Sequence, residues 1–504
     1  MNLIIYGLYN SHHLPMIEDL NRAFKIEYCE IIGNAESNSI KSNSVNECRF
    51  HDWHSISLGY SDVDWNVIAP LDQPLIELMR DCEVEVYRMM DRKSLNVATS
   101  WSYNIRKKIY YEHLRYWNHI LNERKFDCFL SLNIPHEIID FIIYWLCKKK
   151  GIATFFFYQF QYDITFLMSD WTDPLPNYKR DYEALSVELK KKDKYSIELS
   201  ERILSELAIQ RNSKEDYVPF YMRKRKSNFG LRCFSKIKEI VSVLARIAAE
   251  VAKILASPNI DTIYSIINRY RIKYRVEKYK NDSLKSLREL EYTPRSDDRY
   301  IYVPLHLQPE LSTSPMAGRF VDQRLILEML SYHIPDNILL YVKEHPNQDL
   351  SQREYGFYRD IAKIKTVRII SREFSSRNLL SNCVAVATAS GTVGWEAIFM
   401  HKPVLLFGHT FFQYAPGVFK ISSSEDCRKA IERLFSTNSE FASEKDLLSF
   451  LKVIDDSIVR GNIDIEYRKE SKVSYENDIA ALSTSLSRKI RNHLQEGSTR
   501  RESY

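Results

Sequence analysis

The sequence YIYVPLHLQPE, residues 300–310, begins the part of the chain that best indicates the fold class, because from here on β-prone runs alternate regularly with helical ones. We expect strands over residues 301–307, 338–343, 366–370, 384–387 and 403–407, and helices over residues 321–331, 353–364 and 392–400. Strands and helices that alternate in this way form βαβ units with right-handed crossovers. The stretch therefore predicts an α/β domain of the Rossmann type, built on a parallel sheet.

The first 160 residues alternate in a similar way, with longer helical runs between the strands. We expect strands over residues 3–7, 126–132 and 152–158, and helices over residues 103–121 and 137–149. Residues 170–293, in contrast, are helical and basic, and they include the run MRKRK at 222–226, a helix over 237–255 and another over 268–280.

The length of the chain requires more than one hydrophobic core, since 504 residues exceed what one ordinary core supports. We expect a first Rossmann-like domain over residues 1–165 and a helical, basic connecting segment over residues 166–298. A second Rossmann-like domain over residues 299–437 follows, and residues 438–504 form C-terminal helices and a tail. The fold class expected is α/β with two such domains facing a cleft.

The composition excludes some classes of protein. The 71 basic and 66 acidic residues nearly cancel, and a net charge of +5 over this length does not indicate a nucleic-acid-binding protein. None of the eight cysteines lies in a C-x-x-C pair or at zinc-ligand spacing, which favours a reducing, cytoplasmic compartment. The apolar run at 3–7 is shorter than a signal-peptide core, and the run at 240–256 is interrupted by three charges. We therefore expect no membrane-spanning segment.

Polar clusters follow three of the expected strands of the second domain. Their sequences are HLQPE at residues 306–310, KEHP at 343–346 and TASGTVGWE at 388–396. Ligands of open parallel sheets bind at the carboxyl ends of the strands. We therefore expect all three clusters on one rim of the sheet, where they would form a binding site.

The third cluster has the pattern of a phosphate-binding helix start. Backbone amides and a hydroxyl of Ser390, Gly391 and Thr392 would hold phosphate oxygens, and Gly391 would permit their close approach. The alternative interpretation is an ordinary Ser or Thr cap beside a tight turn. Glu396, in the helix that follows, would reach a ribose hydroxyl, or it would simply stabilise an early helical turn.

The other two clusters each place a polar side chain before a proline. Lys343 and His345 alternate onto one side of their strand, and Pro346 ends it, so that His345 would neutralise the phosphate of a leaving nucleotide. A loop histidine before a proline is the plain alternative. Gln308, followed by Pro309 and Glu310, would bind a donor carboxylate or base, or it would satisfy backbone groups of its own loop.

These motifs resemble those of a known family. The stretches YVPLHLQPE at 302–310, VKEHP at 342–346 and SGTVGWEA at 390–397 are similar to the capsular polysaccharide biosynthesis family, which includes Kdo transferases with Gln-Pro and His-Pro motifs. The resemblance covers residues 295–410, and PHE at 135–137 and MDR at 90–92 are also similar.

The resemblance implies a GT-B fold and a CMP-linked sugar, such as CMP-Kdo, as the donor. It also implies a mechanism that uses no metal ion and no other cofactor. It implies that Gln308, Pro309, His345 and Pro346 form the donor pocket, with Ser390, Gly391 and Thr392 beside the phosphate; we add Glu310, Lys343 and Glu396 to the donor site from their positions. The second domain would then bind the nucleotide sugar, and the first would lie on the side of the acceptor.

Direct transfer with inversion also requires a general base, which in a two-domain cleft belongs to the opposite domain. His136 and Glu137, which follow the expected strand at 126–132, are the best candidates, while His12, His13 and Asp19 compete. Alternatively, Glu137 only stabilises a helix start and His136 only packs under a loop. We do not interpret the triplet DVD at 62–64 as a metal site, since no carboxylate cluster surrounds it in the sequence.

The expected function is therefore a glycosyltransferase that builds a capsular or other surface polysaccharide or glycolipid. Two alternatives remain open: a CDP-alcohol phosphotransferase of similar fold, and a non-catalytic component of a polysaccharide assembly complex that binds a sugar nucleotide or glycolipid. An epimerase on the same scaffold is a third. The partners expected are the nucleotide-sugar donor, a glycan or glycolipid acceptor and no nucleic acid. The basic run 222–226 and the helix after it would either bridge the domains or rest on an anionic membrane.

Overall fold

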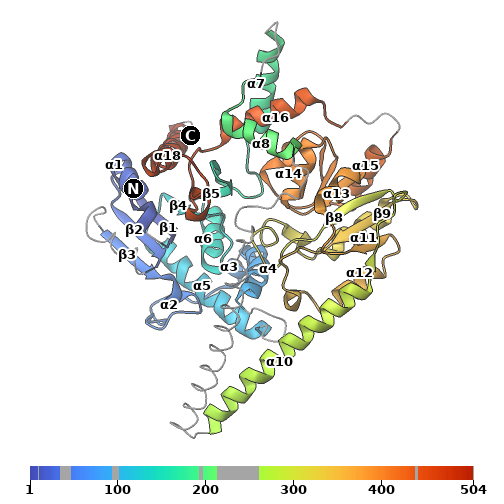
Figure 1. Cartoon of the computed structure of the whole chain (residues 1–504). Coiled ribbons are helices and arrows are strands. Elements are labelled where there is room, and N and C mark those ends of the chain that lie inside the picture. Colours follow the sequence, from blue (N-terminus) through green and yellow to red (C-terminus); the bar gives the residue numbers. More distant parts are fainter. Residues whose placement is uncertain are drawn as a thin grey trace, which may run out of the picture.

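The computed structural model describes residues 1–9, 11–34, 47–93, 101–191, 197–212, 260–436 and 441–502. Within them the chain forms two sheets, each flanked by helices (Figure 1). The basic run 222–226 and the expected helix over 237–255 lie outside the described residues.

The first sheet has the strand order β3-β2-β1-β4-β5-β6. All neighbours are parallel except β5 and β6, which form an antiparallel pair. Its strands are β1 (Asn2–Leu8), β2 (Tyr28–Gly33), β3 (Glu47–Asp52), β4 (Cys128–Ser131), β5 (Ala153–Gln161) and β6 (Ile164–Met168).

Side chains of β1 alternate between two cores, as the period of a strand requires. Leu3 and Ile5 pack with α1 (Leu14–Phe24) and α18 (Tyr475–Glu502), so the end of the chain returns to the first domain. Ile4 and Tyr6 pack with α4 (Arg80–Met89), α5 (Tyr103–Glu123) and α6 (Ile138–Lys149) on the other face. The sheet is thus covered on both faces.

The second sheet has the strand order β13-β12-β11-β8-β9-β10-β7, and its neighbours are parallel throughout. Its strands are β7 (Glu291–Tyr292), β8 (Tyr300–Pro304), β9 (Leu339–Lys343), β10 (Val367–Ile370), β11 (Ala385–Thr388), β12 (Val404–Leu406) and β13 (Val418–Lys420). Helices α11 (Arg324–His333), α12 (Phe357–Ala362) and α15 (Ser424–Leu434) share one core with this sheet, while α13 (Ser376–Asn382) and α14 (Thr392–Phe399) pack on the other face.

The remaining helices connect or flank the two sheets. They are α2 (Trp53–Ile56), α3 (Gln73–Leu78), α7 (Tyr178–Lys191), α8 (Glu201–Asn212), α10 (Ile260–Glu289), α16 (Glu444–Ser457) and α17 (Ile465–Arg468). No helix in these described ranges combines the length and the apolar character needed to cross a bilayer.

The two sheets confirm the expected α/β, GT-B-like fold class with two Rossmann-like domains. One expected helix, over 353–364, is shorter than predicted and spans only Phe357–Ala362. The residue before it, Gly356, has a φ of 78°, a left-handed conformation that interrupts helical geometry. Arg353 consequently lies in the loop ahead of the helix rather than at its start.

An aromatic cluster joins the two domains. Phe166 of the first sheet stacks on Phe411 at a centroid distance of 4.6 Å, and Phe160 packs edge-on against Trp395 of α14 at 5.7 Å. The indole nitrogen of Trp395 donates to Glu206 Oε1 of α8 at 3.1 Å. These contacts hold α14, which begins at one of the predicted site loops, against the first domain.

Candidate functional site

The three polar clusters of the second domain follow neighbouring strands. Strands β11, β8 and β9 lie side by side and are parallel, so their carboxyl ends meet at one edge of the sheet. The cluster 388–396 follows β11, the cluster 306–310 follows β8 and the cluster 343–346 follows β9. The structure thus brings these clusters together at the edge where parallel sheets bind ligands.

A buried arginine connects two of these clusters. The Arg353 guanidinium donates through Nε and Nη2 to both carboxylate oxygens of Glu344, each at 2.8 Å. The same group donates to Gln308 Oε1 at 2.9 Å and to the carbonyl oxygen of His306 at 2.7 Å. The Arg353 and Glu344 side chains are only 3% and 0% exposed. Arg353 therefore fixes the loop after β8 against the loop after β9.

The Gln308 loop is held from two further sides. Gln308 N donates to Gln348 Oε1 at 2.8 Å, and Gln348 Nε2 returns a bond to Gln308 O at 2.9 Å. Gln323 Nε2 donates to Gln308 Oε1 at 3.2 Å. Since the side-chain oxygen of Gln308 is occupied, its amide NH₂ is the group that remains to donate to a ligand. Pro309 and Glu310 follow half-buried, and Glu310 Oε2 accepts from Ser312 N at 2.8 Å.

His306 shapes the loop after β11. Its Nε2 accepts from Thr388 Oγ1 at 3.0 Å and from Ala389 N at 3.1 Å, so this nitrogen carries no proton. Burial, together with the charges of His345 and Arg353, lowers the pKa of His306 to about 3. A Cβ at position 391 would lie 2.9 Å from His306 Cε1, which explains why Gly391 is needed beside this ring.

The Ser390-Gly391-Thr392 loop opens α14. Ser390 Oγ donates to Ser312 O at 2.5 Å, which ties the loop to the segment after Glu310, and Gly391 N donates to Thr388 Oγ1 at 3.1 Å. Thr392 is exposed at the first position of the helix. The first amides of a helix lack intrahelical acceptors and carry partial positive charge, which suits a phosphate. Glu396 is buried in the second turn.

His345 keeps one ring nitrogen for a ligand. Its Nδ1 accepts from Asn347 N at 3.2 Å, so the proton of the neutral ring lies on Nε2, which becomes a donor. Burial lowers the pKa of His345, and Arg353 and Arg372 act in the same direction, while Glu344 and Glu310 oppose them. The ring is therefore a neutral donor at neutral pH.

The neighbours of His345 have other partners. Lys343 is buried, and its Nζ donates to Phe374 O at 2.5 Å and to Ser376 Oγ at 2.7 Å. Pro346 is exposed, and its carbonyl oxygen accepts from the Arg372 guanidinium. Lys343 thus fixes the loop at residues 374–376, and its contact with a phosphate stays a prediction.

The first domain presents His136 at the end of β4. His136 Nδ1 lies 2.6 Å from Ile134 O, to which it donates, so that Nε2 of the neutral ring carries the lone pair. Burial and the Arg92 charge lower the pKa of His136. A neutral imidazole with a free lone pair is the form in which histidine accepts a proton.

Glu137 lies beside His136 as the N-terminal cap residue of α6, but its side chain forms no capping hydrogen bond. Its carboxylate pairs instead with Lys93 Nζ at 3.4 Å. Both side chains are 25% exposed. Asp140, one turn further on, is buried and accepts from His136 N at 3.0 Å, which orients the backbone of the His136 loop.

Arg92 connects the candidates of the two domains. Its guanidinium donates to the carbonyl oxygens of His136 in the first domain and Ser314 in the second. The Glu310 carboxylate acts on the pKa of both His136 and His345, raising each. The loop after β4 therefore lies next to the segment that follows β8, with Arg92 between them.

The competing first-domain candidates lie elsewhere. His13 is buried with Nε2 2.7 Å from Ile463 O, and the His12 ring packs on Tyr475 at 4.6 Å. Asp19 pairs with Arg22 on the surface of α1. These side chains contact the C-terminal segment or their own helix, on the side of α18.

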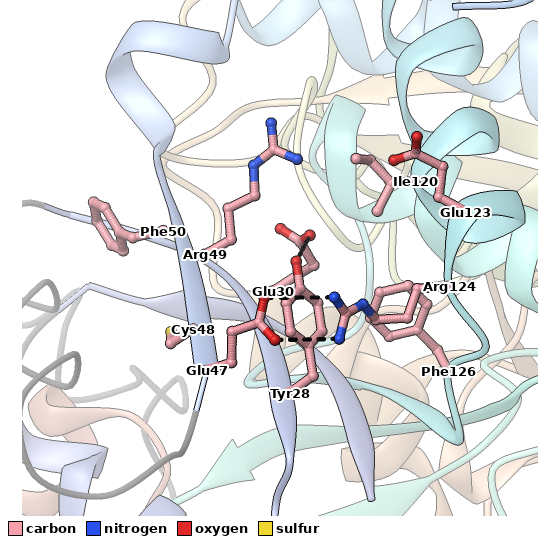
Figure 2. Close-up of a pocket in the computed structure, with 10 residues that line it drawn as sticks. All are labelled: Tyr28, Glu30, Glu47, Cys48, Arg49, Phe50, Ile120, Glu123, Arg124 and Phe126. Atoms are coloured by element: carbon pink, nitrogen blue, oxygen red, sulfur yellow. Dashed lines mark hydrogen bonds and ion pairs between the residues drawn. The ribbon is translucent and has the colours of Figure 1, made fainter.

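A pocket of about 680 Å³ lies away from all these residues, on the face of β2 and β3 that α5 partly covers (Figure 2). Glu30 is buried there, accepting from Tyr28 OH at 2.5 Å and lying 2.6 Å from His51 Nε2. Arg124 stacks over Tyr28 and pairs with Glu47. None of the predicted site residues lines this pocket, so its size does not make it the candidate active site.

The structure adds residues to the site that the sequence analysis did not identify. They are Arg92, His306, Gln323, Gln348, Arg353 and Arg372. The only sequence signals were that His306 lies inside a motif and that Arg92 lies in the MDR stretch. In the ranges that the structure describes, no group of three His, Cys, Asp or Glu side chains is arranged to hold a metal ion.

Residues 262–437 match the family described as "Capsule polysaccharide biosynthesis protein", which confirms the resemblance over the second domain. No curated protein matches the chain.

Solved structures show distant likenesses. KpsC, a β-Kdo 2,7-transferase of Thermosulfurimonas dismutans, is 12% identical over 66% of this chain and 78% of its own, with a TM-score of 0.28. The UDP-GlcNAc 2-epimerase of Methanocaldococcus jannaschii is 12% identical over 88% and 96%, with a TM-score of 0.24. The UDP-GlcNAc 2-epimerase of Neisseria meningitidis is 11% identical over 96% and 99%, with a TM-score of 0.22. At these TM-scores the likenesses carry no argument about the site.

Proposed function

From the match of residues 262–437 to the capsule polysaccharide biosynthesis family, we propose that the chain is a glycosyltransferase of surface-polysaccharide synthesis. Its donor is a nucleotide-activated sugar, CMP-Kdo or a similar CMP-linked sugar, and its acceptor is a glycan or glycolipid. The observation that carries the proposal is the meeting of three polar loops at the carboxyl ends of β11, β8 and β9.

The donor phosphate is assigned to the start of α14. There the amides of the first turn, the hydroxyl of the exposed Thr392 and Nε2–H of His345 supply donors without any cation, while Ser390 Oγ holds the loop through Ser312 O. These groups stabilise the charge that develops on the leaving phosphate, which is the usual task of preorganised donors in a transferase site. The amide of Gln308 is assigned to the donor's carboxylate or base.

The acceptor is assigned to the side of the first domain. Its hydroxyl oxygen attacks the anomeric carbon while the bond from that carbon to the phosphate oxygen breaks, and the nucleotide leaves with the bonding electron pair. Nε2 of His136 takes the proton of the hydroxyl. Attack from the face opposite the leaving group inverts the anomeric configuration, and no step requires a metal ion.

A screen for thermal stabilisation tests the donor class. CMP-, UDP-, GDP- and CDP-linked compounds are added to the full chain, because a ligand that binds only the folded state raises the melting temperature. We expect CMP and a CMP-sugar to stabilise and cytidine, which lacks the phosphate, to stabilise much less. The compound that stabilises is then tested for transfer to a glycan or glycolipid acceptor.

The screen also separates the alternatives. Stabilisation by CDP-linked alcohols together with release of CMP would replace the proposal by the phosphotransferase. Stabilisation by a sugar nucleotide with no turnover on any acceptor would replace it by the non-catalytic component. A cytoplasmic location at the inner face of the membrane is part of the proposal, and the contact predicted for residues 222–226 falls on residues outside the described ranges.

A further inference from the structure

Among the described residues, helix α10 contacts the second domain through the face that carries Tyr279, Lys280 and Leu287. Leu287 is buried in the core of the second sheet, and Tyr279 OH donates to Arg353 O at 2.5 Å. Lys280 Nζ lies 3.8 Å from Asp349 on the same side. The 30-residue helix extends from this attachment, and its first half projects away from the second sheet (Figure 1).

The opposite face of this projecting half carries an apolar and aromatic stripe, formed by Ile263, Ile267, Tyr270 and Tyr274. Their exposed fractions are 37%, 50%, 48% and 70%. The spacing of four, three and four residues places all four within about 60° of the helix circumference, at 3.6 residues per turn. Four large side chains in one exposed row are a feature that soluble surfaces usually lack, and such rows mark interaction sites.

Basic residues flank the stripe on both sides. Arg271, Lys273, Arg275 and Lys278 are all exposed, and in the described part of the chain none of the four has a carboxylate partner. Glu277 is the single acidic residue between 263 and 280. The projecting half therefore presents uncompensated positive charge around its apolar row.

The charge decides which partner fits. The four-three-four spacing would also suit a coiled coil with a second copy of the chain, but the positions beside the seam hold Arg271, Lys273 and Lys278. Pairing two copies would bring like charges together on both sides, which disfavours that complex. An anionic surface avoids this repulsion, because its negative charges attract the basic residues on both sides of the stripe while the apolar row is buried.

We infer that the outward stripe of α10 docks on the surface of an anionic lipid bilayer. Tyrosine rings favour the boundary between headgroups and acyl chains, and arginine and lysine extend their charged ends toward phosphates while their stems stay in apolar surroundings. Such a helix lies in the plane of the interface with its apolar face down. The inference does not depend on the proposed transferase activity.

The test is co-flotation of the full chain with vesicles of phosphatidylcholine, with and without phosphatidylglycerol. We expect binding only to the vesicles that contain phosphatidylglycerol, and we expect it to weaken as salt rises, because the charges are screened. Each basic residue near an anionic surface contributes about fivefold in partitioning, so the double variant Arg271→Gln/Lys278→Gln should bind about 25-fold more weakly. The control Arg433→Gln/Lys472→Gln removes the same charge from other exposed positions and should bind nearly as the wild type does.

A second pair of variants tests the apolar row. Tyr274→Ser should bind several-fold more weakly, whereas Tyr332→Ser, at a tyrosine that is 82% exposed on α11, should not. Equal binding by these two variants, or equal binding to both kinds of vesicle, overturns the inference. If the wild type is a dimer and Tyr274→Ser is a monomer, the stripe binds a second copy of the chain. If the wild type binds no vesicles, an acidic protein is the remaining partner for the stripe. Either result also overturns the inference.

Discussion

Arg353 and Glu344 form a bidentate ion pair in which both side chains are buried, directly beneath the His345 loop. Arg353 also holds Gln308 Oε1 and His306 O, and Tyr358 OH donates to Glu344 Oε2 at 2.7 Å. Through Gln308 and His306, Arg353 positions the loop after β8 against the loop after β9, which begins at Glu344. A buried ion pair of this kind fixes the relative position of the loops that it joins, and it adds little to the free energy of unfolding.

Removing one member of this pair should be costly. Arg353→Met leaves the Glu344 carboxylate buried without its cation, and we expect the free energy of unfolding to fall by about 3–5 kcal/mol. The double variant Arg353→Met/Glu344→Gln should recover a large part of this loss, because no buried charge is left unpaired. Urea unfolding of the two variants and of wild type measures both effects; equal destabilisation by the single and double variants would contradict the prediction.

His345→Ala should reduce turnover far more than stability. The ring is half-buried at the end of β9, and its Nε2–H is assigned to the leaving phosphate. Loss of one preorganised donor typically costs about a hundred- to a thousandfold in rate, whereas a half-buried loop position changes stability by about 1 kcal/mol or less. Initial rates and a melting curve of the same variant check this, with His333→Ala as control, at a half-buried histidine that contacts Ser424 Oγ instead of the site. A variant that melts many degrees lower, or that turns over normally, would identify His345 as structural.

The two first-domain candidates should differ. His136→Asn removes the free lone pair of Nε2 and should lower the rate of transfer by about 10²–10⁴-fold. Glu137→Gln keeps the His136 ring intact and should have a smaller effect, since its carboxylate is paired with Lys93.

The pH profile of the rate identifies the base independently. The pKa of His136 is lowered, so the wild-type rate should stay level at neutral pH and fall only in acid, below the usual histidine range. Glu137→Gln should retain this fall and His136→Asn should lose it. A profile unchanged in His136→Asn would remove the imidazole from the mechanism.

His306 makes stability depend on pH. Its pKa in the folded chain is lowered to about 3, whereas an unfolded histidine titrates near 6.5. Between these values the unfolded state binds one more proton than the folded state, so this contribution is complete above about pH 6.5 and is lost as the pH falls. The slope is at most about 1.4 kcal/mol per pH unit for one group. Unfolding free energies of wild type and His306→Asn at several pH values should differ by this slope; parallel curves would show that folding does not lower the pKa of His306.

Chelation should leave the activity unchanged. The donors assigned to the leaving phosphate are helix amides, a hydroxyl and an imidazole, so they need no cation. The rate after treatment with EDTA should equal the untreated rate. Loss of turnover that magnesium or manganese restores would show that a cation is required.

Much of the regular secondary structure of this protein could be predicted from its sequence. Apolar runs identified the strands near residues 3–7, 126–132 and 152–158 and the five strands β8 to β12, because their side chains are buried on both faces and leave a continuous signal. Strands β2, β3, β6, β7 and β13 were not predicted. β3 is an edge strand with Glu47 and Arg49 exposed, so its composition resembles a loop. The three site motifs were also visible, since each is a short polar stretch after an apolar one.

Which of these segments lie together in the site depends on the three-dimensional fold. The order β11-β8-β9 arises from backbone hydrogen bonds between strands far apart in the chain, and no local pattern records it. The same holds for Arg353, which was expected to begin a helix but lies in a loop, and for Arg92, whose partners His136 and Ser314 are 44 and 222 residues away. A buried charge needs a polar partner, and which residue serves as that partner depends on which side chains packing brings next to it. The three motifs of the site can therefore be predicted from the sequence, whereas the residues that position these motifs depend on long-range pairing.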